Sequence, residues 1–247
     1  TGNTLMSVDV RGSQYCVYPR GNRIGGPTPE ERNVINGFGY YGEEGYPVGT
    51  GVEVLWAQDT IVEGNYIGVT ADGMNRVAQI GQTGVGVADS INTIVRNNLI
   101  SGLWVLGYDH YNGQTFGQAI LVTAYNGDNV GTIIEGNLIG TDATGENPIL
   151  THSGIVVSPL RSNLALRETR IGGSLPVQSN VIAFTDLNGI AVSYEVQGAQ
   201  ILGNSIHSNG LLGIDLAKNW NGLDGVTQND TGDGDVGGND LQNFPVL

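Results

Sequence analysis

The sequence predicts an all-β fold, a parallel β-helix of about seven coils, and three observations support this prediction. A short pattern, Gly followed by Val or Ile, any residue and then Val, recurs along the chain. A second pattern, which ends in Asn, follows most copies of the first. Apolar residues show no helical spacing long enough to define an α-helix. Repeats of this length without helices are typical of solenoids, in which equivalent residues stack from coil to coil.

Copies of the first pattern mark the first strand of each predicted coil. Close copies begin at Gly51, Gly84, Gly154 and Gly189, and looser copies begin at Ser7, Ala119 and Gly213. From Gly51 onward the starts are 33, 35, 35, 35 and 24 residues apart. Each unit therefore contains three short β-branched strands separated by Gly and Asn turns. Ankyrin, tetratricopeptide and armadillo repeats need helices and are excluded, and a propeller needs more two-residue hairpin turns than we find.

The second pattern places an asparagine in the turn between the second and third strands. Its copies are Asn65, Asn98, Asn137 and Asn204. We expect their stacked amides to form an inner ladder that satisfies backbone groups of the turns. On the second strand, Glu63, Arg96 and Glu135 predict a cross-strand charge ladder at the surface. A longer echo, residues 68–73 and 140–145, recurs at a distance of 72 residues.

Composition excludes several classes of function. Lys and Arg number 10 against 24 Asp and Glu, so the net charge of −14 disfavours nucleic acid and anionic membrane surfaces as partners. Apolar runs stay well below the roughly 20 residues that cross a bilayer, so we expect no direct membrane insertion. The single cysteine, Cys16, excludes an internal disulfide framework.

Two stretches resemble a known group of proteins. Residues 62–68 and the phrase Gly-Asn-Leu-Ile-Gly-Thr-Asp-Ala-Thr-Gly at residues 136–145 are similar to the bacterial secreted β-helix repeat proteins of the pectin-lyase-like superfamily. The resemblance covers residues 1–217 and implies a right-handed parallel β-helix, secreted or on a bacterial cell surface, with a ligand groove over the first strand. It does not imply an activity, because this architecture carries lyases, hydrolases, epimerases, adhesins and tailspikes.

We divide the chain into a β-helix at residues 1–217 and an Asp/Gly-rich C-terminal cap or linker at residues 218–247. We interpret the whole as a piece of a larger secreted or surface protein. The C-terminal segment carries four candidate ligands for calcium, the only cofactor that the sequence suggests: Asp230, Asp233, Asp235 and Asp240. Carboxylates alternating with Gly suit Ca²⁺, although the usual loop order with a closing Glu is absent. The alternative is a solvated segment that binds no ion.

Two insertions, residues 37–47 and 103–116, precede the first strands of the second and fourth coils. Insertions in solenoids often lie on the binding face, and aromatic rings beside carboxylates suit sugar recognition. The candidate substrate-binding residues are Tyr40, Tyr41, Glu43, Glu44, Tyr46, Trp104, Tyr108, Asp109, His110 and Tyr111. The alternative is that these aromatic residues only cover the side of the solenoid.

Asp9 and Glu53 are the candidate catalytic residues, because both occupy the outward position of the first strand on adjacent coils. Their carboxylates could approach to about 5–5.5 Å, the separation that retaining glycosidases use. The alternative is that both are solvated acids of an acidic protein. A uronate lyase is disfavoured, because Lys218 is the only lysine and no Arg or His occupies that outward column.

Three functions remain open. The first is an extracellular module that binds a polysaccharide or a cell-surface macromolecule on the first-strand face without catalysis of its own. The second is a polysaccharide hydrolase or lyase with its cleft over the first strand. The third is a shaft or adhesin that self-associates through the ends of the solenoid.

Overall fold

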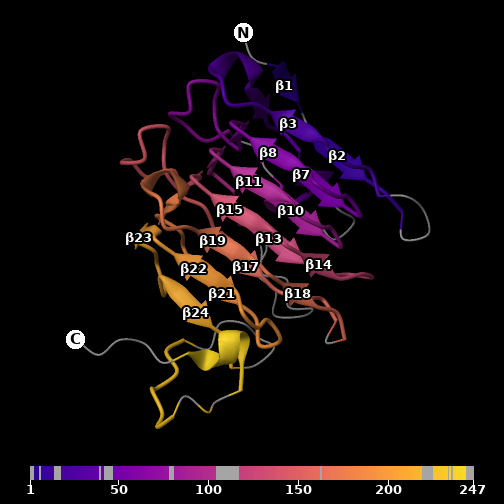
Figure 1. The fold of residues 1–247 in the computed structure, drawn as a ribbon. Helices are drawn as coiled ribbons and strands as arrows, with labels where there is room; N and C mark the ends of the chain where they lie inside the picture. Colours follow the sequence, from indigo (N-terminus) through magenta and orange to yellow (C-terminus); the bar gives the residue numbers. More distant parts are fainter. Residues whose placement is uncertain are drawn as a thin grey trace.

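The chain forms a parallel β-solenoid with almost no helix in a computed structural model (Figure 1). The structure describes residues 3–5, 7–13, 18–38, 40–41, 47–77, 81–103, 117–161, 163–218, 225–232, 234 and 236–242. The predicted all-β solenoid is thereby confirmed. Among the described residues, no helix has the length and apolar character that crossing a membrane requires.

Three parallel sheets run along the solenoid, and each turn of the chain visits them in the same order. The first sheet contains β2 (Val8–Arg11), β7 (Thr50–Leu55), β10 (Thr83–Ala88), β13 (Gln118–Thr123), β17 (Ser153–Val157), β21 (Ile190–Val192) and β24 (Ile214–Leu216). The second contains β3 (Arg23–Gly25), β8 (Ile61–Glu63), β11 (Ile94–Arg96), β15 (Ile133–Glu135), β19 (Arg170–Gly172) and β22 (Gln200–Leu202). The third contains β1 (Asn3–Leu5), β4 (Asn33–Ile35), β9 (Tyr66–Ile67), β12 (Leu99–Ile100), β16 (Leu138–Ile139), β20 (Val181–Ala183) and β23 (Ser205–His207).

Short elements complete the fold. They are the parallel pair β14 (Asn129–Val130) and β18 (Leu166–Arg167), the antiparallel pair β5 (Tyr40–Tyr41) and β6 (Pro47–Val48), and the 3₁₀ turns η1 (Pro29–Glu31), η2 (Pro176–Gln178) and η3 (Gly238–Leu241).

The solenoid has about four full turns, fewer than the seven coils that the repeated pattern predicts. The turns that begin with β7, β10, β13 and β17 have first strands of five or six residues, whereas β2, β21 and β24 have three or four. Counting copies of the pattern overestimates the number of turns, because the three copies at the two ends of the solenoid form only short first strands.

The core consists of aliphatic side chains stacked along the axis. In the first sheet, Val52, Val85, Ile120, Ile155 and Ile190 occupy equivalent positions in neighbouring strands, and all are fully buried. Strands in a sheet lie about 4.8 Å apart, so each of these side chains packs directly on the next one. The alternation of the repeated pattern thus directs its Val and Ile residues inward, as predicted.

The asparagine ladder is confirmed, and it is longer than predicted. The Nδ2 atom of Asn65 donates to Oδ1 of Asn98 at 3.0 Å, and Asn98 donates to Asn137 at the same distance. The structure adds Asn33 at one end and Asn180 between Asn137 and Asn204. From Asn65 to Asn204, each side-chain amide also donates to a backbone carbonyl, so the ladder satisfies buried polar groups that the turns would otherwise leave unpaired.

The charge ladder of the second sheet is more buried than predicted. Only 2% of Glu63 is exposed, and its carboxylate contacts Arg23 at 2.7 Å and Arg96 at 3.0 Å. Glu135 contacts Arg170 at 2.8 Å. Long arginine side chains from adjacent strands therefore cover carboxylates that point away from the core.

Two loops that follow the third sheet touch although they are two turns apart. They are residues 68–77, after β9, and residues 140–149, after β16. The amide of Ala143 donates to the carbonyl of Gly73 at 2.9 Å. Gly73 has φ +72°, and a Cβ atom there would lie 2.7 Å from that of Ala143. The contact therefore requires glycine at this position.

The described part of the C-terminal segment packs beside the last strand of the first sheet (Figure 1). The amide of Gly238 in η3 donates to the carbonyl of Ala217 at 2.8 Å, and that of Asn239 donates to Val196 at 2.6 Å. Leu241 is buried, with 5% of its surface exposed.

Candidate functional site

The outer face of the first sheet carries the two predicted catalytic residues as neighbours. Asp9 on β2 lies opposite Glu53 on β7 in the parallel register. Arg11 contacts both carboxylates. The sequence prediction did not include it, because it lies two residues further along β2 than Asp9, outside the column that contains Asp9 and Glu53. Its Nε atom lies 3.2 Å from Oδ2 of Asp9, and its Nη2 atom forms an ion pair with Glu53.

This arrangement is an ion triad on a partly exposed surface. Burial opposes the charged form of Arg11, but the charges of Glu53 and Asp9 outweigh it and raise the pKa of the guanidinium. Because one arginine pairs with both carboxylates, the triad suits a structural or binding role. A catalytic role for Asp9 and Glu53 stays a prediction.

The first aromatic insertion begins and ends as a β-hairpin. Tyr40 and Tyr41 form β5, which pairs in antiparallel fashion with β6 immediately before β7. The other predicted substrate-binding residues lie outside the described residues: Glu43, Glu44, Tyr46, Trp104, Tyr108, Asp109, His110 and Tyr111. The insertion site therefore remains a prediction.

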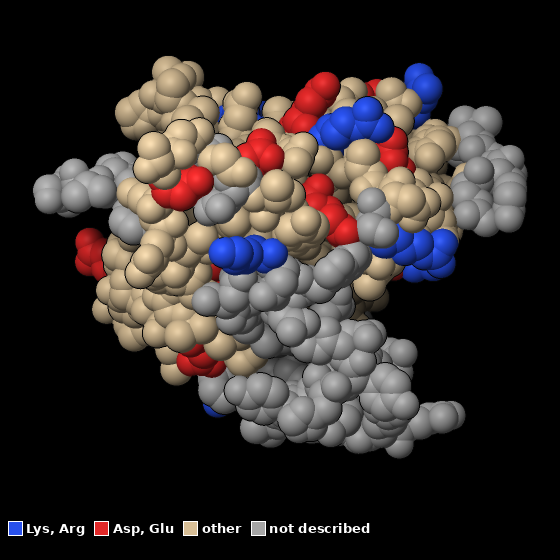
Figure 2. All heavy atoms as spheres, turned by 90° about the horizontal axis from the view of Figure 1, so that it is seen from below, with Lys and Arg blue, Asp and Glu red and all other residues tan. Residues whose placement is uncertain are grey.

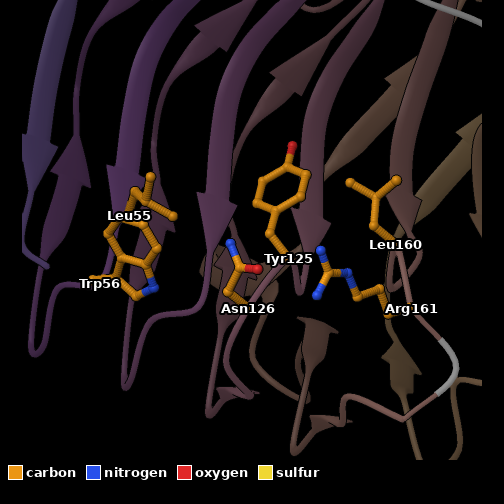
Figure 3. Close-up of a pocket in the computed structure, with 6 residues that line it drawn as sticks. All are labelled: Leu55, Trp56, Tyr125, Asn126, Leu160 and Arg161. Carbon is orange, nitrogen blue, oxygen red and sulfur yellow. The ribbon is translucent and has the colours of Figure 1, made fainter. Parts of the chain in front are cut away.

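A pocket that sequence reasoning missed lies at the opposite edge of the same sheet, where the first strands end (Figure 3). We call it the edge pocket. Its volume is about 340 Å³, and it is lined by Leu55, Trp56, Tyr125, Asn126, Leu160 and Arg161. These residues lie at or just beyond the ends of β7, β13 and β17. The only signal in the sequence was the presence of large aromatic residues in turns otherwise rich in small polar ones.

Tyr125 stands at the centre of the edge pocket, between Trp56 on one side and Arg161 on the other (Figure 3). Burial, followed by the negative charges of Glu53 and Asp89, raises the pKa of its phenol. A phenol is protonated at neutral pH even at its ordinary pKa, so the hydroxyl can donate a hydrogen bond. Asn126 adds both an amide donor and a carbonyl acceptor.

Asp89 holds the turn that carries Tyr125 and Asn126. It is fully buried, and its Oδ1 atom accepts a hydrogen bond from the Tyr125 amide at 2.6 Å. Its Oδ2 atom accepts one from the Asn126 amide at 3.1 Å. The backbone that carries Tyr125 and Asn126 is therefore held by hydrogen bonds to a buried carboxylate.

The predicted calcium ligands are only partly described. Asp230 accepts a hydrogen bond from the Gly234 amide at 3.2 Å, and Asp240 belongs to η3. Asp233 and Asp235 lie outside the described residues. In the part of the chain that the structure describes, no three acidic, His or Cys residues are grouped so as to hold a metal ion. The calcium site stays a prediction.

Charges of both signs mix on the face at one end of the solenoid. Seen from the end of the solenoid at which η3 lies, acidic and basic side chains are interspersed among uncharged ones (Figure 2).

Comparison of the chain with protein-family models, curated proteins and solved structures found no match.

Proposed function

We propose that this β-solenoid is an extracellular module that binds carbohydrate on the outer face of its first sheet. The edge pocket is the observation that carries the proposal. Flat aromatic faces stack on the C–H groups of sugar rings, and amide, phenol and guanidinium groups bond to hydroxyls. Trp56, Tyr125, Asn126 and Arg161 combine these two properties in one cavity.

The size of the pocket suits a short segment of a glycan. Ligand sites commonly measure about 300–1,000 Å³, and the edge pocket lies near the lower limit. By analogy with aromatic pairs, each stacking contact contributes about 0.5–1.5 kcal/mol beyond the area that it buries. Two such contacts add only about 1–3 kcal/mol, well short of the roughly 8 kcal/mol of a micromolar complex, so we expect micromolar or weaker affinity for an oligosaccharide.

The resemblance of residues 136–145 to secreted bacterial β-helix repeat proteins supports the finer parts of the proposal. These are a right-handed winding, a pectin-lyase-like ancestry and a secreted or cell-surface location in a bacterium. In pectin-lyase-like proteins the ligand lies over the first strand of each turn. In this protein those first strands form the first sheet, whose edge borders the edge pocket.

The test is a glycan array, followed by titration calorimetry with the glycan that binds best. Tyr125→Ala and Arg161→Ala should each weaken binding about 10-fold or more, since each removes a direct contact. Arg76→Ala, an exposed arginine in the loop after β9, is the matched control and should leave the affinity unchanged. Tyr41→Ala and Tyr111→Ala test the insertion site in parallel. If a glycan binds and none of these substitutions weakens it, the proposed face is wrong.

The second candidate function is a polysaccharide-active enzyme. The observation that favours it is the register that places Asp9 opposite Glu53. The Arg11 contacts count against it, because a retaining glycosidase needs one of its two carboxyl groups protonated. Reducing-sugar and 235-nm absorbance assays over neutral and acidic polysaccharides test it. Turnover that Asp9→Asn or Glu53→Gln abolishes would replace binding with catalysis as the function.

A further inference from the structure

We propose that Asp89 is the positioning residue of the edge pocket: it sets the placement of Tyr125 and Asn126 without contacting the ligand. The part of this inference that concerns ligand affinity rests on the proposed function. The part that concerns the turn rests on geometry alone. Asp89 follows β10 directly, and both of its carboxylate oxygens accept hydrogen bonds from the next turn of the solenoid.

The residue type fits this task. Two consecutive backbone amides point at one side chain, so the side chain must accept twice and donate nothing. A carboxylate does this, whereas an asparagine in its place would turn an NH₂ group toward one of the two amides. Burying a carboxylate costs free energy unless hydrogen bonds compensate, and charge-assisted bonds are about twice as strong as neutral ones. The cost of burying Asp89 is thus offset by the two hydrogen bonds that it accepts from the turn.

Asp89 also lies at the junction of the segments that line the pocket. The six lining residues come from the ends of β7, β13 and β17, so the turn after β10 lies among them without contributing a wall. Ala88, the last residue of β10, and Asp89 instead hold the backbone of the two neighbouring turns. The carbonyl of Ala88 accepts from the Trp56 amide at 3.2 Å, while Asp89 accepts from Tyr125 and Asn126. Trp56 and Tyr125 are therefore fixed relative to each other through two adjacent residues.

The experiment uses the full chain and Asp89→Asn. Asp89 has φ +48°, a conformation that Asn tolerates, so the substitution removes a charge without adding backbone strain. We expect the amides of Tyr125 and Asn126 to exchange with deuterium about 10-fold faster, and the affinity for the array-selected glycan to fall about 10-fold, measured well below the melting temperature. The phenol of Tyr125 should titrate at lower pH, because one of the charges that raise its pKa is gone.

The matched control is Asp142→Asn. Asp142 is also buried and also accepts two backbone amides, those of Thr144 at 3.1 Å and Asn147 at 3.4 Å, but its loop after β16 contributes no residue to the lining of the pocket. We expect this variant to keep the wild-type affinity and the wild-type exchange of Tyr125 and Asn126. An equal loss of affinity in both variants would mean that general destabilisation explains the effect, and it would overturn the proposal.

Two further outcomes separate this inference from the proposed function. If the wild-type protein binds no glycan, the proposed function fails, and exchange and phenol titration still decide whether Asp89 holds the turn. If glycan binds but Asp89→Asn leaves exchange and affinity unchanged, the positioning role fails alone. Should the variant not fold, fast exchange of the Tyr125 and Asn126 amides in the wild-type protein would itself overturn the inference.

Discussion

Single polar side chains carry much of the order in this fold, and Asn98 is the clearest case. It is almost fully buried, its Oδ1 atom accepts from the backbone and side-chain amides of Asn65, and its Nδ2 atom donates to Asn137 and to the carbonyls of Val62 and Arg96. Removing the amide leaves groups on two neighbouring turns unpaired, and each unpaired group costs about 1–3 kcal/mol.

We therefore expect Asn98→Ala to lower the free energy of unfolding by about 2–4 kcal/mol, as measured by urea denaturation. Asn163→Ala, at an exposed turn, should change it by less than about 0.5 kcal/mol. Equal effects of the two substitutions on the free energy of unfolding would show that the asparagine ladder stabilises the fold no more than an exposed asparagine does.

Asp142 makes one of the loops sensitive to acid. The hydroxyl of Thr144 stabilises its ionised carboxylate, burial opposes this, and Asn147 adds to the stabilisation, so the pKa falls to about 2 from the usual 3.8. Because the pKa in the folded protein is the lower one, this stabilisation is complete above about pH 4. It is lost as the pH falls through 2.

We expect the amide resonances of Thr144 and Asn147 to shift with a midpoint near pH 2, followed by NMR during acid titration. Asp142→Asn should abolish this transition and leave the loop equally stable at pH 4 and pH 2. A midpoint near 3.8 in the wild-type protein would contradict the hydrogen-bonding account.

At the scale of strands, the buried ladders couple each turn to its neighbours. Ile155 in β17 packs between Ile120 of β13 and Ile190 of β21. We expect Ile155→Ala to lower the free energy of unfolding by about 2–5 kcal/mol, since it removes buried methyl groups and leaves a cavity. Hydrogen exchange should accelerate in all three strands.

Val156→Ala is the control, because it lies next to Ile155 in the same strand but on the outer, partly exposed face. We expect Val156→Ala to lower the free energy of unfolding by clearly less than Ile155→Ala does. Faster exchange confined to β17 in the Ile155 variant would mean that the turns unfold independently.

The strands were predictable from sequence, because the alternation of Val and Ile states which side chains point inward. Glu63 shows the limit of that method. Its outward position followed from the pattern, but its burial depends on arginines contributed by β3 and β11. Arg11 was missed for a related reason: it lies one outward step beyond the column that contains Asp9 and Glu53.

The edge pocket was harder to foresee, since its lining comes from turns whose residues do not repeat. Tyr125 and Arg161 are 36 positions apart, and only the register of β13 with β17 brings their turns together. The buried Asp89 gave no signal, because an aspartate in a turn is usually solvated. The predicted insertion site and calcium site remain predictions.

For the molecule as a whole, the net charge of −14 should select among ligands. We expect neutral or cationic glycans to bind better than polyanions, because a polyanion meets a repulsive field over most of its approach. The positive charge of Arg161 offsets this repulsion only near the edge pocket.

Calorimetry at about 10 and 150 mM salt checks this expectation, since the Debye length falls from about 30 to about 8 Å over that range. The affinity for a polyanion should improve as salt is added, while that for a neutral glycan should not change. A polyanion that binds best at low salt would reverse the argument and make Arg161 the dominant charge.

The contact between Gly73 and Ala143 sets a rule for changing the length of this solenoid. The two loops belong to turns that are two apart and echo each other in sequence at a distance of 72 residues, so the unit that repeats there contains two turns. Deleting the middle turn would drive one loop into the other, and adding one would separate them by a further strand spacing. A designer who lengthens the protein at this point should therefore splice in pairs of turns, just as a duplication of such a pair would have produced the echo between residues 68–73 and 140–145.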